Sequence, residues 1–197
     1  MTTLVQPTSN SLAALRPIVP ERNGISADDS LYEIVHGVRV ELPPMSFLAI
    51  WIANRLNGFL WPFVDKNKLG MAIVEAIFIL DVENDLRRRP DVAFVSAQTW
   101  PLDRPIPKVG DLPVAPDLAV EVNSPTDVMD KVIDKIIEYF HHGVREVWLI
   151  LPMQGQVYVY TSPTQVRILT AEDELTDTIV PGFRLNLAEL FGDAGKV

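Results

Sequence analysis

The chain of 197 residues contains no cysteine and only three histidines. Without cysteine, disulfides, thiolate metal sites and a cysteine nucleophile are all excluded. Two of the histidines, His141 and His142, are neighbours, which argues against a zinc site built from imidazole ligands. The chemistry of this protein therefore has to come from other side chains.

Basic residues are also scarce. Lys and Arg number 17 against 26 Asp and Glu, which gives a formal net charge of −9 at pH 7. This balance argues against a generally basic protein that coats nucleic acid. It leaves a nuclease open, because the magnesium site of a nuclease is itself acidic.

The sequence lacks a hydrophobic run long enough to span a membrane. The most apolar long stretch, residues 46–64, is interrupted by polar residues and a proline, and it predicts a core helix. The start of the chain has neither a basic segment nor an apolar run, so no signal peptide is recognisable. We therefore expect a cytoplasmic protein without a membrane partner.

Composition and pattern indicate the domain organisation. Hydrophobic residues make up 48% of the chain, enough for one domain with a sizeable core. Residues 1–25 mix proline, serine and threonine with scattered Leu and Val, and predict an arm that is loosely ordered or packed on a partner. Over residues 26–197 we predict a single α/β domain, with helices on a mixed β-sheet.

Hydrophobic periodicity, turn residues and capping residues predict the individual elements. Strands are expected in a hairpin over 26–43 that turns at His36 and Gly37, in one long run over 69–80, and at 90–96, 116–123, 147–151, 156–161 and 165–169. Helices are expected at 46–64, from Ser124 to Gly143, and at 187–191. Turns or loops are expected at 81–89, 98–114 and 171–177.

The stretch Pro116-Asp-Leu-Ala-Val-Glu-Val-Asn-Ser-Pro125 is the feature around which the chain is organised. Its aliphatic residues alternate with polar ones, as in a strand with one buried face. Asp117 and Glu121 are four positions apart, so both fall on the face opposite the aliphatic side chains. The helix that follows carries Lys131 and Lys135 one turn apart on one face. Strand carboxylates followed by a lysine on the returning helix are typical of a metal-assisted hydrolase.

Further charged residues stand within or beside predicted strands. Glu75 lies inside an apolar run, where a carboxylate is either solvated on an open face or directed into a site. Arg87, Arg88 and Arg89 form the only basic run, which suits either a solvated loop or contact with phosphates. Asp91 follows directly, at the opening of the next strand.

Six segments occur in an order that resembles the Uma-type restriction-endonuclease family, a bacterial family within the PD-(D/E)XK nuclease superfamily. They span residues 31–191, nearly the whole predicted domain. A Pro-Asp pair alone is a weak signal, whereas the serial combination is specific. The segments are Tyr32-Glu-Ile-Val-His-Gly, Arg89-Pro-Asp-Val-Ala-Phe-Val, Pro116-Asp-Leu-Ala-Val-Glu-Val-Asn-Ser-Pro, Lys135-Ile-Ile-Glu-Tyr, Gly143-Val-Arg-Glu-Val-Trp-Leu and Pro181-Gly-Phe.

The resemblance implies a restriction-endonuclease-like fold, a mixed β-sheet flanked by helices, and hydrolysis of a phosphodiester in nucleic acid, with DNA as the expected substrate. It implies Mg²⁺ as the cofactor, with Mn²⁺ as an alternative. We expect a homodimer, because two sites can then address two strands. The superfamily pattern has a lysine where this chain has Asn123, and family members supply it from the following helix, where Lys135 takes the matching place.

The resemblance also implies roles for individual residues. The implied catalytic residues are Asp91, Glu121 and Lys135. The implied metal ligands are Asp91 and Glu121, with Asp117 or Glu75 either as a further ligand or as a residue that supports the ligands from behind. Beside these implied roles, we expect Arg88, Arg89 and Lys131 to contact the substrate.

A structural interpretation of the same residues stays open. Asp91 and Asp117 both follow proline at strand starts, where aspartate often bonds local backbone amides. Glu121 and Lys135 also fit a plain salt bridge. The alternative function is therefore a catalytically silent nuclease-fold protein that acts as a binding or interaction module. A carboxylate-pair glycosidase is disfavoured, because no aromatic sugar platform lies near Asp117 and Glu121 in the sequence.

Overall fold

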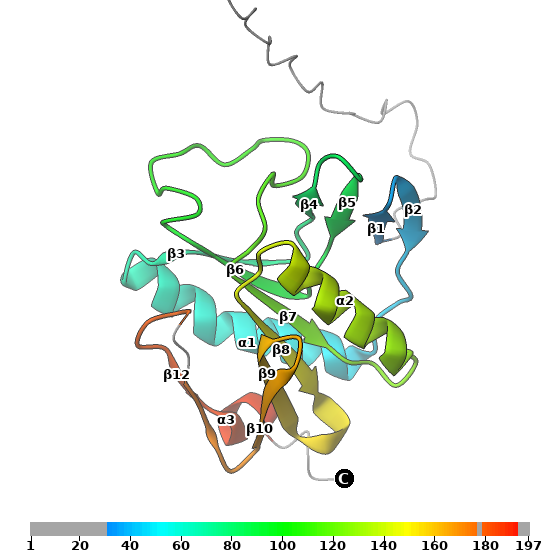
Figure 1. Cartoon of the computed structure of the whole chain (residues 1–197). Helices are drawn as coiled ribbons and strands as arrows, with labels where there is room; N and C mark the ends of the chain where they lie inside the picture. Colours follow the sequence, from blue (N-terminus) through cyan, green and yellow to red (C-terminus); the bar gives the residue numbers. More distant parts are fainter. Residues whose placement is uncertain (1–30, 177–178, 193–197) are drawn as a thin grey trace, which may run out of the picture.

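The computed structural model describes residues 31–176 and 179–192. Within these ranges the chain forms a six-stranded sheet, a four-stranded sheet and a two-stranded ribbon, with helices packed around them (Figure 1). The expected α/β class with a mixed sheet is confirmed. The predicted arm over residues 1–25 lies outside the described residues, as does the predicted start of the domain at residue 26.

The six-stranded sheet is the centre of the molecule. Its strand order is β10-β9-β8-β7-β6-β3, and β7 and β8 are its parallel pair while the other neighbours are antiparallel. The strands are β3 (Gly70–Val74), β6 (Val92–Ser96), β7 (Leu118–Val122), β8 (Glu146–Leu151), β9 (Gln156–Ser162) and β10 (Gln165–Thr170).

The remaining elements surround this sheet. The four-stranded antiparallel sheet has the order β2-β1-β5-β4 and contains β1 (Tyr32–Val35), β2 (Val38–Glu41), β4 (Phe78–Asp81) and β5 (Leu86–Arg88). The ribbon pairs β11 (Glu174–Thr176) with β12 (Arg184–Asn186). The helices are α1 (Phe47–Lys66), α2 (Met129–His141), α3 (Leu187–Phe191) and the short 3-10 helix η1 (Pro152–Gln154).

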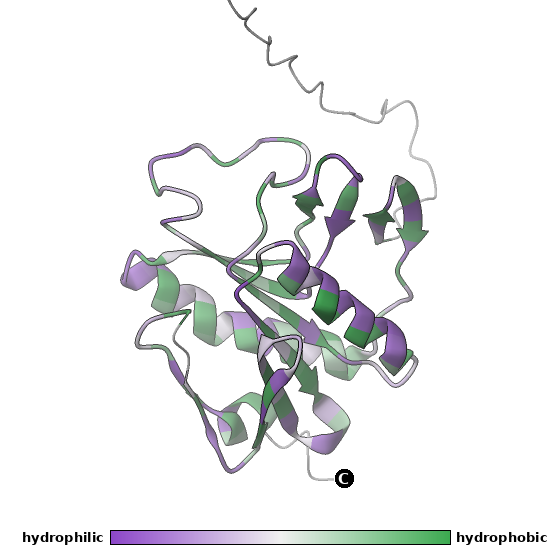
Figure 2. Ribbon diagram, in the orientation of Figure 1, coloured by the Kyte–Doolittle hydropathy of each residue, from purple (hydrophilic) through white to green (hydrophobic). Residues whose placement is uncertain are grey.

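Helices α1 and α2 cover opposite faces of the six-stranded sheet (Figure 1). Leu118 and Val120 on β7 pack into the core cluster that contains α1, whereas Ala119 packs into the cluster that contains α2. The predicted two faces of this strand are thus confirmed, and Glu121 is directed toward α2. Figure 2 shows mostly hydrophobic residues on the central strands, while α2 carries hydrophilic residues as well.

Several predicted features are confirmed in detail. Ser46 caps α1, because its hydroxyl accepts a hydrogen bond from the Ala49 amide at 3.2 Å. His36 and Gly37 form the hairpin turn, both with positive φ. The final helix occupies residues 187–191 as expected. None of the helices in the described ranges combines the length and apolar character that crossing a membrane requires.

The prediction of one strand over residues 69–80 is wrong. The chain leaves the six-stranded sheet after β3 and enters the four-stranded sheet as β4. Between the two strands, Glu75 has a φ of 55°, in the left-handed region that a glutamate seldom adopts. Apolar residues continue through this break, so hydrophobicity alone could not reveal it.

Three other boundaries also differ from expectation. Helix α2 begins at Met129 and not after Ser124, because the Asp127 carboxylate accepts the Ser124 amide at 2.6 Å and closes a turn ahead of the helix. The segment 81–89, expected to be a turn, contains strand β5. The segment 171–177, expected to be an exposed turn, contains strand β11, which buries Leu175.

The entry into β3 depends on a glycine. Gly70 has a φ of 146°, and a Cβ at this position would lie 2.1 Å from the Val95 carbonyl oxygen on β6. An alanine would therefore push β3 away from β6, in addition to straining its own backbone.

We expect Gly70→Ala to lower the free energy of unfolding by more than about 2 kcal/mol, because it combines a steric clash with backbone strain. Urea titration followed by circular dichroism measures the effect. Gly58→Ala is the matched control, since this position lies within α1 and a Cβ added there would meet no atom within 4 Å. It should raise stability by up to about 1 kcal/mol. Equal effects of the two substitutions would contradict the role given to Gly70.

Candidate active site

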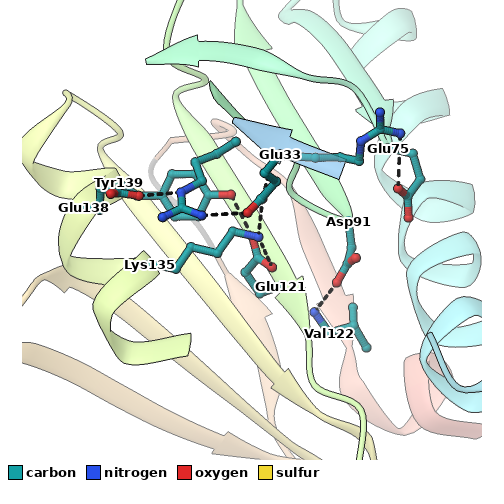
Figure 3. Close-up of polar contacts among 10 residues, drawn as sticks. Glu33, Glu75, Asp91, Glu121, Val122, Lys135, Glu138 and Tyr139 are labelled. Atoms are coloured by element: carbon teal, nitrogen blue, oxygen red, sulfur yellow. Dashed lines mark hydrogen bonds and ion pairs between the residues drawn. The ribbon is translucent and has the colours of Figure 1, made fainter. Parts of the chain in front are cut away.

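The candidate site lies between β7 and α2, where a buried carboxylate meets a buried lysine (Figure 3). The chain runs from β7 through α2 to the parallel strand β8, and this crossover lays α2 over the face of β7 that carries Glu121. Lys135 Nζ lies 2.9 Å from Glu121 Oε1 and 3.0 Å from Oε2. One helical turn later, the Tyr139 hydroxyl donates to Glu121 Oε1 at 2.7 Å.

A second carboxylate, from Glu33 on β1, completes the surroundings of Lys135. Glu33 is only 2% exposed, and its Oε1 lies 2.8 Å from Lys135 Nζ. The same carboxylate accepts a hydrogen bond from Arg88 Nη1 at 2.7 Å and another from the Arg89 amide at 2.9 Å. Burial by itself would raise the pKa of Glu33, but Lys135 and Arg88 hold it below its ordinary value.

Lys135 and Glu121 respond differently to this arrangement. Burial lowers the pKa of Lys135, but Glu121 and Glu33 outweigh that effect and raise it, so the lysine is held in its cationic form. The pKa of Glu121 is raised, because burial and the negative charge of Glu33 exceed what the shared Lys135 compensates. Glu121 is therefore the less satisfied of the two carboxylates.

Asp91 stands just before β6, beside the end of β7. Its Oδ2 accepts the Val122 amide of β7 at 2.6 Å, which fixes the carboxyl next to Glu121. Burial raises the pKa of Asp91 well above its ordinary value, and the neighbouring charge of Glu121 raises it further. The Val122 hydrogen bond and Lys135 act in the opposite direction without cancelling these effects.

Glu75 and Arg89 form the outer part of the site. The Glu75 amide donates to the Asp91 carbonyl at 3.3 Å, so the strained backbone at Glu75 is joined directly to the site. Burial raises the pKa of Glu75, whose side chain is 35% exposed and lies 4.0 Å from Arg89 Nη1. Arg89 packs near the Tyr32 ring, and its Nε is buried without a hydrogen-bond partner among the described residues.

Arg88 does not have the free guanidinium that a phosphate contact requires. Its Nη1 donates to Glu33 and its Nε to Glu138 on α2, and its side chain is 14% exposed. The pairing of β5 with β1 turns this arginine toward α2 instead of toward solvent. In this structure Arg88 is an internal ion-pair partner, and the expected contact of Arg88 with substrate stays a prediction without support from these contacts.

Asp117 is not part of the cluster either. Its carboxylate accepts the Ser96 amide at 2.8 Å and pairs with Arg145 at 3.2 Å. It shares a strand face with Glu121, but four residues of strand separate the two side chains by about 13 Å. The contacts of Asp117 with the Ser96 amide and Arg145 favour the structural interpretation of this aspartate, and its role as a metal ligand stays a prediction without support from this geometry.

Lys131 and Asn123 complete the set of predicted positions. Lys131 is exposed, one turn before Lys135, and its side chain makes no ion pair or hydrogen bond with the described residues. The Oδ1 atom of Asn123 is buried and has no hydrogen-bond partner in the described part of the chain. No lysine stands at position 123, and the ammonium group beside Glu121 is that of Lys135, as the family pattern implies.

The carboxyls of Asp91, Glu121 and Glu75 are oxygen ligands of the kind that Mg²⁺ prefers. The pKa of each is raised, so nearby cations leave part of their negative charge uncompensated, and a divalent cation would supply the missing positive charge. Among residues 31–176 and 179–192, no three His, Asp or Glu side chains are arranged to hold an ion as they stand. Lys135 and Tyr139 engage both oxygens of Glu121 in this structure.

Two members of the site were missed in the sequence analysis. Glu33 lies in the segment Tyr32-Glu-Ile-Val-His-Gly, and Tyr139 ends the segment Lys135-Ile-Ile-Glu-Tyr. Both segments carry the family resemblance, which was the available signal. For Tyr139 there was a second one, because it follows Lys135 by four positions and therefore shares its helix face.

Comparison with known proteins first defines the class of fold. A solved structure is similar to this chain with a TM-score of 0.72 and 20% sequence identity, covering 83% of this chain and 90% of the other. It is described as the crystal structure of a putative nuclease belonging to DUF820 from Anabaena variabilis ATCC 29413 at 1.96 Å resolution. This likeness confirms the expected fold class.

The family follows from the sequence match. The model of the family Uma2, described as "Putative restriction endonuclease", matches residues 21–188. The chain therefore belongs to the Uma2 family, and the resemblance drawn from its motifs is confirmed. A search of curated proteins finds no match.

The raised pKa of Asp91 predicts a pH-dependent cost to the fold. A carboxyl that holds its proton more tightly when folded loses stability as pH rises from its ordinary pKa through its raised one. We expect Asp91→Asn to raise the melting temperature at about pH 8 by at least ~2–4 °C, the shift that about 1 kcal/mol gives in a chain of this length. The gain should shrink as pH falls toward the ordinary value of 3.8.

Thermal melts over this pH range measure the effect, and Asp117→Asn is the control. That substitution weakens the ion pair with Arg145 and should bring no gain in stability. A lower melting temperature for Asp91→Asn at about pH 8 would show that Asp91 mainly serves its backbone hydrogen bond, as the structural interpretation holds.

Proposed function

We propose that this protein is a metal-dependent endonuclease that hydrolyses phosphodiester bonds in nucleic acid, with DNA as its substrate. The observation that carries the proposal is the position of cationic Lys135 beside Glu121, with Asp91 fixed next to that carboxylate. Membership of the Uma2 family supports a nuclease. The substrate, the metal and the roles of the residues are our proposal.

Each residue has a distinct task in the proposed reaction. Asp91 and Glu121 would hold Mg²⁺ or Mn²⁺, with the half-exposed Glu75 as a further ligand. The metal, when bound, would neutralise the scissile phosphate and lower the pKa of the attacking water. Lys135 remains cationic and donates hydrogen bonds either to that water or to the phosphate oxygens as their negative charge grows.

Substrate contact is assigned to Arg89 and Lys131. The Arg89 side chain is 14% exposed, like that of Arg88, but its only ion pair with the described residues is the 4.0 Å contact of Nη1 with Glu75. Its guanidinium therefore retains donors for a phosphate next to the proposed metal ligands. Lys131 is exposed on the same helix as Lys135 and would meet the phosphate backbone further out. A homodimer would present two such sites to the two strands of a duplex.

The second candidate function is a binding or interaction module without catalytic activity. The observation in its favour is that Lys135 and Tyr139 satisfy both Glu121 oxygens, so this ion pair is complete without any ligand. The net charge of −9 also favours a partner other than nucleic acid. Metal binding separates the two functions, because an interaction module has no need of it.

Cleavage of supercoiled plasmid and of single-stranded DNA in Mg²⁺ or Mn²⁺ tests the activity. Glu121→Gln and Lys135→Ala should each lower the cleavage rate by about 10²–10³-fold, the usual cost of removing a group that stabilises the transition state. Lys131→Ala is the matched control on the same helix and should lower the rate by less than ~10-fold, through weaker binding. Equal cleavage by all variants would indicate a contaminating nuclease and contradict the site.

Thermal melting with and without metal tests the cofactor independently of cleavage. At a Mn²⁺ concentration of about 100 times Kd, binding to the folded state alone should stabilise the protein by ~2.7 kcal/mol. For a chain of this length, that corresponds to a rise in melting temperature of about 5–10 °C. Asp91→Asn should abolish this rise, and sodium chloride of equal ionic strength should not reproduce it. No rise in the wild-type protein would favour the interaction module.

A further inference from the structure

The ammonium group of Lys135 serves two carboxylates from different sheets (Figure 3). Lys135 Nζ lies 2.8 Å from Glu33 Oε1 and 2.9 Å from Glu121 Oε1. In the proposed function, Glu121 is a metal ligand and Glu33 has no role. The structure therefore contains a buried carboxylate at the reaction centre whose purpose the proposed chemistry leaves unexplained.

A metal ion at Glu121 would compete with the present contacts of Lys135. Both Glu121 oxygens are engaged, one by Lys135 alone and the other by Lys135 and Tyr139. A divalent cation at this carboxylate would also repel the ammonium group at short range. We therefore expect Lys135 to give up Glu121 when the metal binds, and a buried ammonium left without a partner is costly.

Glu33 is placed to remain with the lysine. Arg88 and the Arg89 amide bind its carboxylate from two further directions, and Glu138 in turn holds Arg88. These contacts, together with a side chain that is 3% exposed, make Glu33 itself unavailable as a metal ligand. They leave it a fixed negative charge within reach of Lys135.

We propose that Glu33 is a positioning residue that retains Lys135 when Glu121 passes from the lysine to the metal ion. The proposal rests on the proposed metal site. Lys135 then contacts one carboxylate, Glu33, in place of two. This remaining contact keeps the lysine cationic and beside the reacting phosphate. Glu33 acts only through Lys135 and touches neither the metal nor the substrate.

Calorimetric titration of the full chain with Mn²⁺ tests this exchange without relying on cleavage. In Glu33→Gln, Lys135 has only Glu121 as a close carboxylate partner, so the metal has to displace it at greater cost. We expect the Mn²⁺ affinity to fall about tenfold, within the usual range of coupling between contacting residues. Lys135→Met removes the competing ammonium and should raise the affinity.

The double variant Glu33→Gln/Lys135→Met is decisive. Without the lysine, Glu33 has nothing to retain, so its substitution should change the affinity by less than about twofold in this background. An equal loss with and without Lys135 would mean that Glu33 acts as a distant negative charge, and would overturn the proposal. An unchanged affinity in Glu33→Gln would overturn it as well.

Two more variants control for a general effect of the substitutions on folding. Glu138→Gln takes a carboxylate from Arg88 but leaves the contacts of Lys135 intact, and it should keep the affinity within about twofold. Glu33→Asp keeps the charge and shortens the side chain, so it serves where Glu33→Gln does not fold. It should also weaken Mn²⁺ binding, and only when Lys135 is present, whereas a purely electrostatic role predicts no change.

The outcomes separate this inference from the proposed function. Wild-type protein that binds no Mn²⁺ overturns both the metal site and the exchange. Wild-type binding without coupling between Glu33 and Lys135 overturns the exchange alone and leaves the metal site intact.

Discussion

A buried lysine shared by two carboxylates is the interaction on which the rest of the structure depends. Glu33 comes from β1, Glu121 from β7 and Lys135 from α2, so segments far apart in the sequence must pack correctly before their charges are compensated. Leaving one such charge buried and unpaired costs about 3–5 kcal/mol. The network thereby fixes the four-stranded sheet against α2 and the six-stranded sheet, and the site forms where these three meet.

The two carboxylates that share Lys135 differ in how far their negative charges are compensated. Glu33 receives Lys135, Arg88 and a backbone amide, and its pKa is lowered. Glu121 shares the same lysine and receives only a tyrosine hydroxyl besides, and its pKa is raised together with that of Asp91. The negative charge of Glu33 is thus better compensated than those of Glu121 and Asp91, and a further positive charge would be favoured on the side of Glu121 and Asp91.

The sequence was sufficient to predict those site residues that belong to one continuous segment of the chain. Period-two alternation placed Glu121 on the face of its strand that meets α2, and helical spacing returned Lys135 over it. The same periodicity gives the face of a strand but not the distance along it, so it could not show that Asp117 pairs with Arg145, away from Glu121. Glu33 was missed because the sequence alternation of a hairpin strand is the same in two cases. The strand face that carries the polar residue can be exposed to water, or it can pack against another helix or sheet. Only the packing of β1 beside α2 decides between these cases.

The use of the basic residues explains how an acidic chain could still act on a phosphodiester. Of the run of three arginines, Arg87 pairs with Asp85 and Asp111, and Arg88 pairs with Glu33 and Glu138. Arg89 has only a 4.0 Å contact with Glu75, so it is the least engaged by carboxylates of these three arginines. With so few protein cations at the site, most of the positive charge that meets the scissile phosphate would have to come from the metal. Substrate binding and catalysis would then depend on the same ion, and an ammonium that competes with it for Glu121 would control both.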